Sequence, residues 1–399
     1  MASALPGRRL LMTGRKIAHI TTVDLSLESL LLNQLLALKA AGFDVVGISS
    51  PGPHVAAIEA AGIRHIPVAI SRKLTPVADF LSLARLYAVM RRERFDIVHT
   101  HTPKAGLLGQ LAARLARVPI IVNTIHGFYF HERMSRLARQ FYILLEKVAA
   151  GCSHLILSQN AEDLETAVRE RICPRGKIKL LGNGIDFRRF DPATISDEQV
   201  IQHRESLRIS PDEEVVGFVG RLAARRKGFT DFLSAAAHLA SQRSTTRFLI
   251  IGGTDHGKPD AVEPGAAADY GIADRCLFLG HRSNAELPML YRIMNVLVLP
   301  SLFEGLPRVV MEACAMGVPC VVSDVKGNRE VVTHGRNGFL VPFGDVTALS
   351  AAITQILTQP ELASTMSNEG RRIAAAHFDE RIVFDKVISE YRRLLAAAP

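Results

Sequence analysis

The sequence lacks an apolar run of the length that crosses a bilayer, which takes about 20 consecutive apolar residues. The nearest approach is the segment 30–41, and Asn33, Gln34 and Lys39 interrupt it. The first residues include basic side chains but no apolar segment followed by a small-residue cleavage site, so we expect no signal peptide. These absences argue against a membrane-spanning helix and favour a cytoplasmic protein.

Motifs for disulfides, metals and dinucleotides are also missing. The cysteines are odd in number and show no C-x-x-C spacing, which favours reduced thiols: Cys152, Cys173, Cys276, Cys314 and Cys320. His99 and His101 alternate along one predicted strand, but no carboxylate or cysteine cluster completes a metal site, so we expect none. No G-x-G-x-x-G fingerprint follows the first predicted strand, which argues against a dinucleotide-dependent oxidoreductase.

The length of 399 residues exceeds what one hydrophobic core usually serves, so we expect two domains. Turn residues and charged residues crowd the segment 183–212, where we place the hinge, and we end the first domain at residue 190. The net charge of +9 is concentrated in residues 1–190, which contain 26 Lys and Arg against 14 Asp and Glu. A basic half of this kind suits an anionic partner, and nucleic acid is not expected because no binding motif accompanies the charge.

Two predicted helices combine this basic charge with apolar residues. They cover the segments 81–94 and 133–147. Amphipathic helices of this composition can lie on an anionic lipid surface. They can equally pack their apolar side on a sheet and solvate the other side, and the sequence leaves both interpretations open.

Short apolar runs alternate with helical patterns along the chain, which predicts an α/β protein with parallel sheets. A first series of strands is expected at 16–20, 44–48, 97–101, 120–123 and 155–158. A second series is expected at 215–219, 247–251, 276–279, 296–299 and 319–323. Helices fill the gaps, for example at 29–41, 104–116, 161–169, 230–241, 346–357 and 380–396.

The most informative segment follows the predicted strand 296–299. Gly305 and Pro307 break that strand and open an apolar helix, so Glu304 falls on the loop at the carboxyl end of a strand, where open α/β sheets bind ligands. The free N–H groups of the next helix point to the same place and suit a phosphate. Glu312 lies in that helix, roughly two turns further on. Two carboxylates beside such amides suit a polyhydroxylated molecule that carries a phosphate.

The same segment resembles the donor site of the retaining glycosyltransferases of family 4. The resemblance rests on Glu304-x7-Glu312, on the run 315–319 and on Ser323-Asp324-x-x-Gly327-x-x-Glu330, and it extends over about residues 14–395. It implies the GT-B fold, in which two Rossmann-like doubly wound domains face a central cleft. It also implies an N-terminal acceptor domain at 1–190, a C-terminal nucleotide-sugar domain at 191–378 and a final helix, 379–399, that crosses back to the first domain.

In this resemblance, Glu304 contacts the transferred sugar and Glu312 the ribose. Arg221 and Lys227, which follow the strand 215–219, clamp the donor diphosphate, with Arg226 as the alternative to Lys227. His126, in an Asn-Thr-Ile-His-Gly turn after another strand, lies against the sugar. The remaining donor-binding positions that the resemblance implies are Gly220, Gly253, Arg282, Gly305, Leu306, Pro307 and Arg308.

The acceptor side is less well marked, because the segment 21–26 replaces the Gly-Gly loop that the family often has after its first strand. Asp24, on this segment, is a candidate for contacting the acceptor. Lys104 opens a helix after Pro103 and is a candidate for meeting an acceptor phosphate.

The resemblance implies a hexosyltransferase that moves a hexose or N-acetylhexosamine, with retention, from a nucleotide sugar to a hydroxyl of a glycan or polyprenyl-diphosphate-linked acceptor in cell-surface polysaccharide biosynthesis. UDP is the default nucleotide. No D-x-D motif is present, so we expect neither a metal nor another cofactor. The alternatives are a nucleotide-sugar 2-epimerase of the same fold, a glycoside hydrolase and a catalytically silent binding subunit. We expect the protein in the cytoplasm or peripherally at the inner face of the plasma membrane.

Overall fold

The computed structural model describes residues 14–72, 75–130 and 134–397, which form two compact units. The first unit holds the described residues up to Gly182 and those from Arg381 onward, and the second is Asn183–Glu380. The chain therefore passes between the units at 182/183 and 380/381, where we expected 190/191 and 378/379. The second unit begins earlier because Ile185 and Phe190 are buried in its own core.

The first unit is built on a 7-stranded parallel sheet of order β3-β2-β1-β4-β5-β6-β7. Its strands are β1 (Lys16–Val23), β2 (Asp44–Ser50), β3 (Arg64–Pro67), β4 (Ile97–His101), β5 (Ile120–Ile125), β6 (Leu155–Ser158) and β7 (Ile178–Leu180). The central strands β1, β4 and β5 are buried over almost their whole length, as expected for parallel strands that are covered on both faces.

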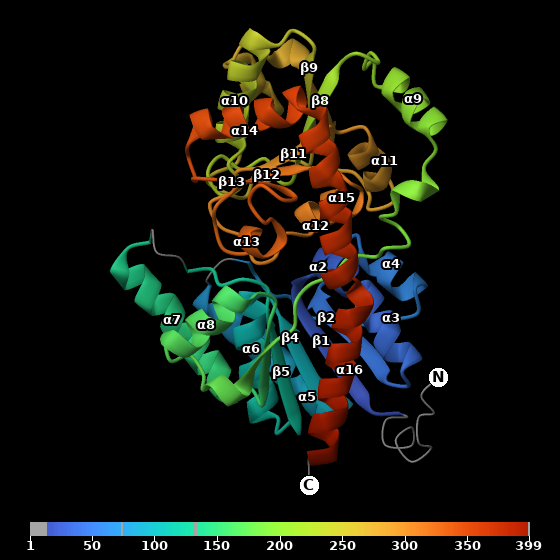
Figure 1. Cartoon of the computed structure of the whole chain (residues 1–399). Helices are drawn as coiled ribbons and strands as arrows, with labels where there is room; N and C mark the ends of the chain where they lie inside the picture. Colours follow the sequence, from blue (N-terminus) through green and yellow to red (C-terminus); the bar gives the residue numbers. More distant parts are fainter. Residues whose placement is uncertain (1–13, 73–74, 131–133, 398–399) are drawn as a thin grey trace. The chain divides into compact units, whose positions relative to one another are not determined.

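Helices cover both faces of this sheet (Figure 1). One face carries α5 (Pro76–Glu93) and α6 (Pro103–Leu115), and the other carries α3 (Leu32–Ala40) and the final helix α16 (Glu380–Ala397). The unit also contains α2 (Asp24–Ser26), a π-helical turn (Leu27–Leu31), α4 (Val55–Ala60), α7 (Arg136–Cys152), α8 (Ala161–Arg169) and a 3-10 turn (Arg175–Lys177). Since the last helix of the chain packs on the first sheet, the two ends of the sequence share one core.

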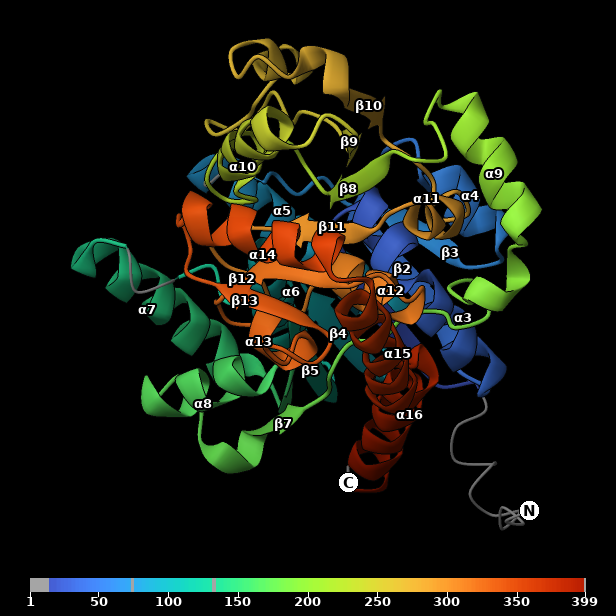
Figure 2. The ribbon, with the colours of Figure 1, turned by 45° about the horizontal axis from the view of Figure 1, so that its top comes forward.

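The second unit has a 6-stranded parallel sheet of order β10-β9-β8-β11-β12-β13. Its strands are β8 (Glu214–Val219), β9 (Thr246–Ile251), β10 (Cys276–Gly280), β11 (Val296–Leu299), β12 (Cys320–Ser323) and β13 (Gly338–Val341). Figure 2 shows α10 (Phe229–Gln242) and α14 (Val346–Thr358) beside this sheet, and they form one apolar layer with it. The other layer includes α11 (Leu287–Arg292), α12 (Arg308–Ala315) and α15 (Pro360–His377).

The remaining elements of the second unit are short or peripheral. They are the helices α9 (Asp197–Ser206) and α13 (Asn328–Val331) and the 3-10 turns Pro192–Thr194, Pro264–Ala268 and Ala273–Arg275. In both sheets the chain order reverses beside the first strand, between β1 and β4 and between β8 and β11. This reversal is the point at which open α/β sheets bind ligands.

The sequence predicted ten of these strands close to their observed positions, and three match in full: 97–101, 155–158 and 296–299. The α/β fold with two doubly wound parallel sheets is confirmed. The edge strands β3, β7 and β13 were not predicted. None of the described helices combines the length and the apolar composition that crossing a bilayer requires.

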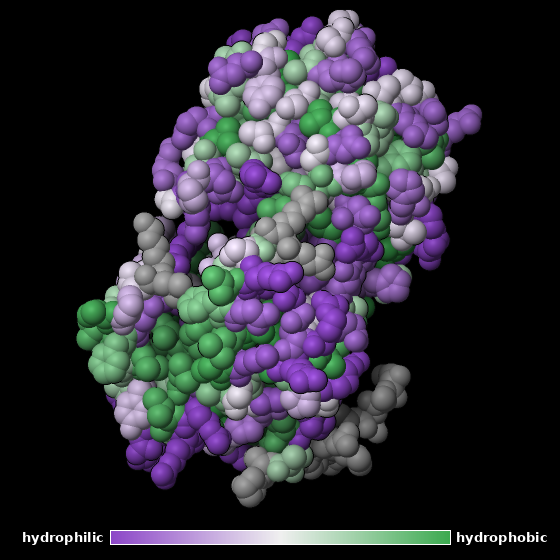
Figure 3. Space-filling view, turned by 90° about the vertical axis from the view of Figure 1, so that its left-hand side faces the viewer, coloured by the Kyte–Doolittle hydropathy of each residue, from purple (hydrophilic) through white to green (hydrophobic). Residues whose placement is uncertain are grey.

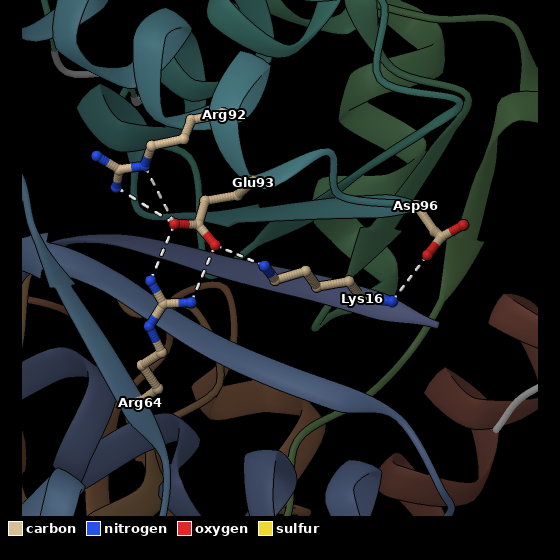
Figure 4. Close-up of polar contacts among 5 residues, drawn as sticks. All are labelled: Lys16, Arg64, Arg92, Glu93 and Asp96. Carbon is tan, nitrogen blue, oxygen red and sulfur yellow. Dashed lines mark hydrogen bonds and ion pairs between the residues drawn. The ribbon is translucent and has the colours of Figure 1, made fainter. Parts of the chain in front are cut away.

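One ionic cluster lies at the edge of the first sheet where β1 and β4 begin (Figure 4). Glu93, at the end of α5, accepts two hydrogen bonds of 2.9 Å from Arg64 and one of 2.5 Å from Lys16. Asp96 accepts from the backbone N–H of Lys16 at 2.8 Å. These bonds, first those from Arg64 and then that from Lys16, lower the pKa of Glu93 to about 2.

We expect Glu93→Gln to lower the free energy of unfolding by roughly 1–2 kcal/mol at pH 7, because three charge-assisted hydrogen bonds lose their anion in partly solvated surroundings. Since folding lowers the pKa of Glu93 from its usual value of 4.5, the contribution of Glu93 to stability is complete above that pH and is lost as the pH falls through about 2. Urea unfolding of both proteins at pH 7 and pH 3 measures the difference. Glu165→Gln, on the exposed side of α8, is the control, and a difference that does not shrink at pH 3 contradicts the assignment.

Candidate functional site

Oppositely charged side chains meet in the second unit at the carboxyl edge of β8 and β11. Lys227 lies on the loop after β8 and Glu304 on the loop after β11. The Nζ of Lys227 lies 2.6 Å from Oε1 of Glu304, and the two side chains are only 20% and 8% exposed. Residues that are 77 positions apart in the sequence are thus joined by a charge-assisted hydrogen bond at the point where the strand order reverses.

Glycines allow the loops at this edge to approach each other closely. A Cβ on Gly228 would lie 1.9 Å from the carbonyl oxygen of Pro300, and one on Gly327 would lie 2.1 Å from that of Gly305. Both glycines have positive φ, +66° and +76°. A larger residue would push the loops after β8, β11 and β12 apart, so these glycines set how near Lys227 stands to Glu304.

The helix α12 begins at Arg308, directly after this loop, with Pro307 in the N-cap position. The side chain of Pro307 makes no capping hydrogen bond to the first N–H groups of this helix. Leu306 is buried, and its carbonyl oxygen accepts a hydrogen bond of 3.3 Å from the amide of Asn183. Gly305, Leu306, Pro307 and Arg308 therefore form the N-terminal end of a helix whose amides can receive an anion.

Glu312 lies one layer deeper. It is 4% exposed, and its Oε2 accepts a hydrogen bond of 2.9 Å from the hydroxyl of Tyr291, while Oε1 lies 3.8 Å from Nε of Arg308. Burial raises the pKa of Glu312, and Arg308, Tyr291 and Arg189 oppose that rise. Since Oε2 of Glu312 is bound to Tyr291, Oε1 is the oxygen that lies nearer to Arg308, the first residue of α12.

Two further basic residues follow β8 near the pair. Arg221 is held by Asp255, with 3.2 Å between NH1 and Oδ2. Arg226 lies over the ring of Phe303, 4.1 Å from its centroid, and its carbonyl accepts from the N–H of Leu302. Of the two alternatives that the spacing left open, Lys227 is the one that contacts Glu304, while Arg226 stacks on the neighbouring aromatic residue.

Two other expected donor residues lie further along the same edge. Gly220 follows β8, and its carbonyl is approached so closely by Gly252 that a Cβ there would lie 1.9 Å away. The carbonyl of Gly253 accepts from the N–H of Leu222 at 3.0 Å. Arg282 follows the edge strand β10 and pairs with Glu286, with 3.2 Å between NH1 and Oε1.

His126 belongs to the first unit, on the turn after β5, and is partly exposed. Its Nε2 lies 3.0 Å from Nδ1 of His101, and its side chain also hydrogen-bonds Gln159. Burial lowers the pKa of His126 to about 4, so the ring is neutral at physiological pH.

The two candidate acceptor residues are engaged by their own unit. The carboxylate of Asp24 accepts from the backbone N–H groups of Leu25 at 2.9 Å and His54 at 2.8 Å, which ties the end of β1 to the segment after β2. Lys104, at the start of α6, lies 2.5 Å from Oδ1 of Asp79. Both contacts are structural, and an acceptor would have to share them.

Sequence reasoning missed Tyr291 and Asp255, which hold charged groups in place, because each lies on an element other than that of its partner. Phe303 directly precedes Glu304 in the motif segment, but its contact with Arg226 is visible only in the structure. Sequence reasoning considered His99 and His101 for a metal site but missed His19, the third member of a buried cluster. In the described part of the chain, ring nitrogens of His19, His99 and His101 lie within 4.8 Å of one another, a spacing that a metal ion could bridge. Every ring nitrogen of these three residues, however, already has a protein hydrogen-bond partner.

Comparisons with known proteins match both units. A family model described as "Glycosyl transferases group 1" matches residues 199–373, and one described as "Glycosyl transferase 4-like domain" matches residues 28–184. A UDP-Gal:alpha-D-GlcNAc-diphosphoundecaprenol alpha-1,3-galactosyltransferase of Escherichia coli is 29% identical over 381 residues, which cover 94% of this chain and 96% of the relative. The capsular polysaccharide biosynthesis glycosyltransferase CapM of Staphylococcus aureus is 27% identical over 395 residues, covering 96% and 98%.

Among solved structures, Anabaena HepE in complex with UDP and glucose superposes with a TM-score of 0.81 at 19% identity, covering 94% of this chain and 99% of that one. At this identity the likeness concerns the fold.

We expect Tyr291→Phe to lower the free energy of unfolding by about 1–2 kcal/mol, because the buried carboxylate of Glu312 loses its hydroxyl donor while the ring volume stays nearly the same. The midpoint and slope of the urea unfolding curve of the full-length protein measure this loss. Tyr270→Phe, in the opposite apolar layer, is the matched control. Equal midpoints for Tyr291→Phe and the wild type would show that the hydrogen bond does not support Glu312.

Proposed function

Because the chain belongs to the family 4 glycosyltransferases of GT-B fold, we propose that its second unit binds a nucleotide sugar at the edge formed by the loops after β8, β11 and β12. The chain is a glycosyltransferase of polysaccharide biosynthesis. The observation that carries the donor assignment is the Lys227–Glu304 pair beside the N-terminus of α12. It combines a cation, a carboxylate and helix amides in one place, which is what a sugar diphosphate needs.

In this proposal Lys227 and Arg221 contact the diphosphate. Without donor, Glu304 and Asp255 hold these cations in position. A diphosphate would replace or share those carboxylate contacts, and the amides at Gly305–Arg308 would add to its binding. Glu304, released from part of its contact with Lys227, then accepts hydrogen bonds from hydroxyls of the transferred sugar. Glu312 offers its remaining oxygen to the ribose.

The proposed chemistry needs no metal. The acceptor hydroxyl oxygen forms a bond with the anomeric carbon on the same face from which the nucleoside diphosphate leaves, and the departing phosphate oxygen takes the proton. Negative charge grows on that phosphate as the glycosidic bond to it breaks. Arg221, Lys227 and the α12 amides stabilise this charge electrostatically. Gly220, Gly253 and Arg282 follow the strands β8, β9 and β10 and are further proposed donor contacts, and His126 is the proposed histidine contact of the transferred sugar.

The donor and acceptor follow from the relatives. The Escherichia coli relative is named for transfer from UDP-Gal to a diphosphoundecaprenol-linked sugar. We therefore infer a UDP-sugar donor and a polyprenyl-diphosphate-linked acceptor for this chain. The basic excess of residues 1–190 suits an acceptor that carries a diphosphate, with Lys104 and Asp24 as candidate contacts. A 2-epimerase of the same fold and a silent binding subunit are the competing functions.

An exposed apolar stripe on α7 supports association with a membrane surface. Leu137, Phe141, Leu144 and Val148 lie on one side of the helix, and Leu137 and Leu144 are 87% and 58% exposed. Figure 3 shows the apolar surface of the first unit to which they contribute. The opposite side of α7, with Ile143, packs inside the unit. An apolar stripe in a basic unit fits an anionic bilayer, where the acceptor lipid resides.

The other basic helix, α5, combines both kinds of surface. Leu86, Val89 and Met90 pack on the sheet, and Arg92 contacts Glu93 in the ionic cluster. On another side of α5, Val77 and Phe80 are 78% and 68% exposed. Each of the two basic helices thus packs part of its apolar surface in the core and exposes another part.

We expect UDP to raise the melting temperature of the purified protein more than GDP or ADP, since a ligand at a hundred times its dissociation constant stabilises by about 2.7 kcal/mol. We expect Lys227→Ala to weaken this response, because the diphosphate loses a direct cation. If no nucleotide raises the melting temperature, the donor site loses its support and the catalytically silent binding subunit is favoured.

Glu304→Ala should abolish sugar transfer from the responding donor to a polyprenyl-diphosphate acceptor while the protein stays folded. The measurement is product formation, with circular dichroism as the check on folding. Glu361→Ala, on the exposed side of α15, is the control and should transfer normally. Near-normal transfer by folded Glu304→Ala would refute its role. Release of free epimerised sugar without acceptor would favour the epimerase.

Membrane association predicts that the protein floats with phosphatidylglycerol vesicles and less with phosphatidylcholine vesicles. The double variant Leu137→Gln/Leu144→Gln should reduce the floated fraction several-fold, because it removes the most exposed apolar area of α7. Ile201→Gln, at a 55% exposed position of α9, is the matched control. Absence of wild-type flotation with either lipid, or an unchanged fraction in the double variant, would rule out this surface.

A further inference from the structure

A continuous chain of hydrogen bonds runs from His126 into the interior of the first unit. Nε2 of His126 lies 3.0 Å from Nδ1 of His101, and Nε2 of His101 lies 3.0 Å from Nδ1 of His19. Nε2 of His19 lies 3.2 Å from the hydroxyl of Tyr391, which in turn lies 2.6 Å from Nδ1 of His99. Nε2 of His99 reaches the hydroxyl of Thr124 at 2.7 Å, where the chain ends.

The sheet register builds this chain. His19 of β1 is paired with His99 of β4, and His101 of β4 is paired with Thr124 of β5. Because side chains alternate along a strand, His99 and His101 point to the same face, which is the face that α16 covers. Tyr391 of α16 inserts its hydroxyl between His19 and His99. The series of hydrogen bonds therefore joins the last helix of the protein to the turn that carries His126.

All the inner members are removed from water. His19, His99 and Tyr391 are 0% exposed and His101 is 2% exposed, whereas His126 at the outer end is partly exposed. Burial lowers the pKa of His19 to about 3 and those of His99 and His101 well below their usual value. Each ring is therefore neutral and has one N–H donor and one acceptor nitrogen.

Because each neutral ring has one donor and one acceptor nitrogen, the proton position on one ring determines the proton positions on all the others in the hydrogen-bonded series. If Nε2 of His126 carries the proton, it donates to His101, His101 donates to His19, and His19 donates to Tyr391. The Tyr391 hydroxyl then donates to His99, which donates to Thr124. If His126 is protonated on Nδ1 instead, every step must reverse, because a single reversed ring would set two donors or two acceptors against each other in the dry interior.

The two directions differ at Tyr391, whose hydroxyl lies 2.6 Å from Nδ1 of His99 and 3.2 Å from Nε2 of His19. In one direction the hydroxyl donates to His99 across the shorter contact and accepts from His19, and the proton of His126 is then on Nε2. We adopt this direction as part of the proposal, and the tautomer of His126 tests it.

We propose that this buried relay, from Thr124 through His99, Tyr391, His19 and His101, fixes the tautomer and ring plane of His126, so that His126 presents an unprotonated Nδ1 on its other side. Tyr391 is then a positioning residue that acts through the relay. The proposal deepens the proposed function, in which His126 contacts the donor sugar. An acceptor nitrogen of fixed orientation would receive a hydrogen bond from a sugar hydroxyl.

The relay also accounts for the three imidazoles that could bridge a metal. A metal bound by His19, His99 and His101 would have to break hydrogen bonds to Tyr391, Thr124 or His126, and in the described part of the chain the group of possible metal ligands contains only these three histidines. Hydrogen bonding alone satisfies every nitrogen. We therefore assign the three histidines to the hydrogen-bonded relay and not to a metal site.

The test is long-range ¹H–¹⁵N correlation NMR of the full-length protein labelled with ¹⁵N-histidine, in which protonated and unprotonated ring nitrogens have widely separated shifts. His126→Gln assigns the His126 signals. We expect a single neutral tautomer with Nε2–H in the wild type and a mixture of both tautomers in Tyr391→Phe, which retains the ring but removes the hydroxyl link. Thr124→Val, which removes the terminal acceptor, is the second variant if Tyr391→Phe does not fold. Tyr87→Phe, on α5, is the matched control and should leave the spectrum unchanged.

The proposal is overturned if wild-type His126 carries its proton on Nδ1 or already averages between tautomers, or if the folded relay variants leave its shifts unchanged. Stoichiometric metal in the purified protein, measured by elemental analysis, would also overturn it in favour of a metal site. Because the spectra are recorded without donor or acceptor, their outcome is independent of sugar transfer. A fixed tautomer in a protein that binds no nucleotide would retain the relay and remove only the proposed function.

Discussion

In a parallel sheet every strand ends at the same edge, and that constraint places the candidate residues of the second unit together. β8 and β11 are neighbours in register, with Val216 beside Val296, although long crossovers separate them in the sequence. The loops that follow them must therefore leave the sheet side by side. Gly228 and Gly327 let these loops touch backbone to backbone, and the contact between Lys227 and Glu304 follows. Loss of that close approach would separate the cation from the carboxylate without changing either residue.

The two units hold their polar groups by opposite physical means. In the second unit, Lys227 and Arg221 form ion pairs with Glu304 and Asp255 and keep 20% and 25% of their side chains exposed, so they can exchange these protein partners for a charged ligand. In the first unit, His19, His99 and His101 are buried and neutral, and their hydrogen bonds have no solvent to exchange with. The first arrangement suits binding and release of an anion. The second suits the fixing of one side-chain orientation.

Much of the architecture could be predicted because buried parallel strands are short, continuous apolar runs, and β4, β6 and β11 were placed in full for this reason. The strands that were missed, β3, β7 and β13, all lie at sheet edges and have three or four residues. An edge strand is buried less evenly and pairs on one side only, so its sequence has little pattern. The boundary between the units was placed too late because the turn-rich segment from Asn183 onward contributes Ile185 and Phe190 to the second core.

By itself, the sequence determined the fold class, the two series of strands and the loops on which Glu304, Lys227 and His126 stand, since hydrophobic periodicity and turn residues are local properties. Only the tertiary structure decided which partners these residues have. Tyr291 supports Glu312 and Asp255 holds Arg221 from separate elements, and Tyr391 reaches His19 from the far end of the chain. Contacts of this kind depend on strand order, register and helix packing, and no local pattern records them.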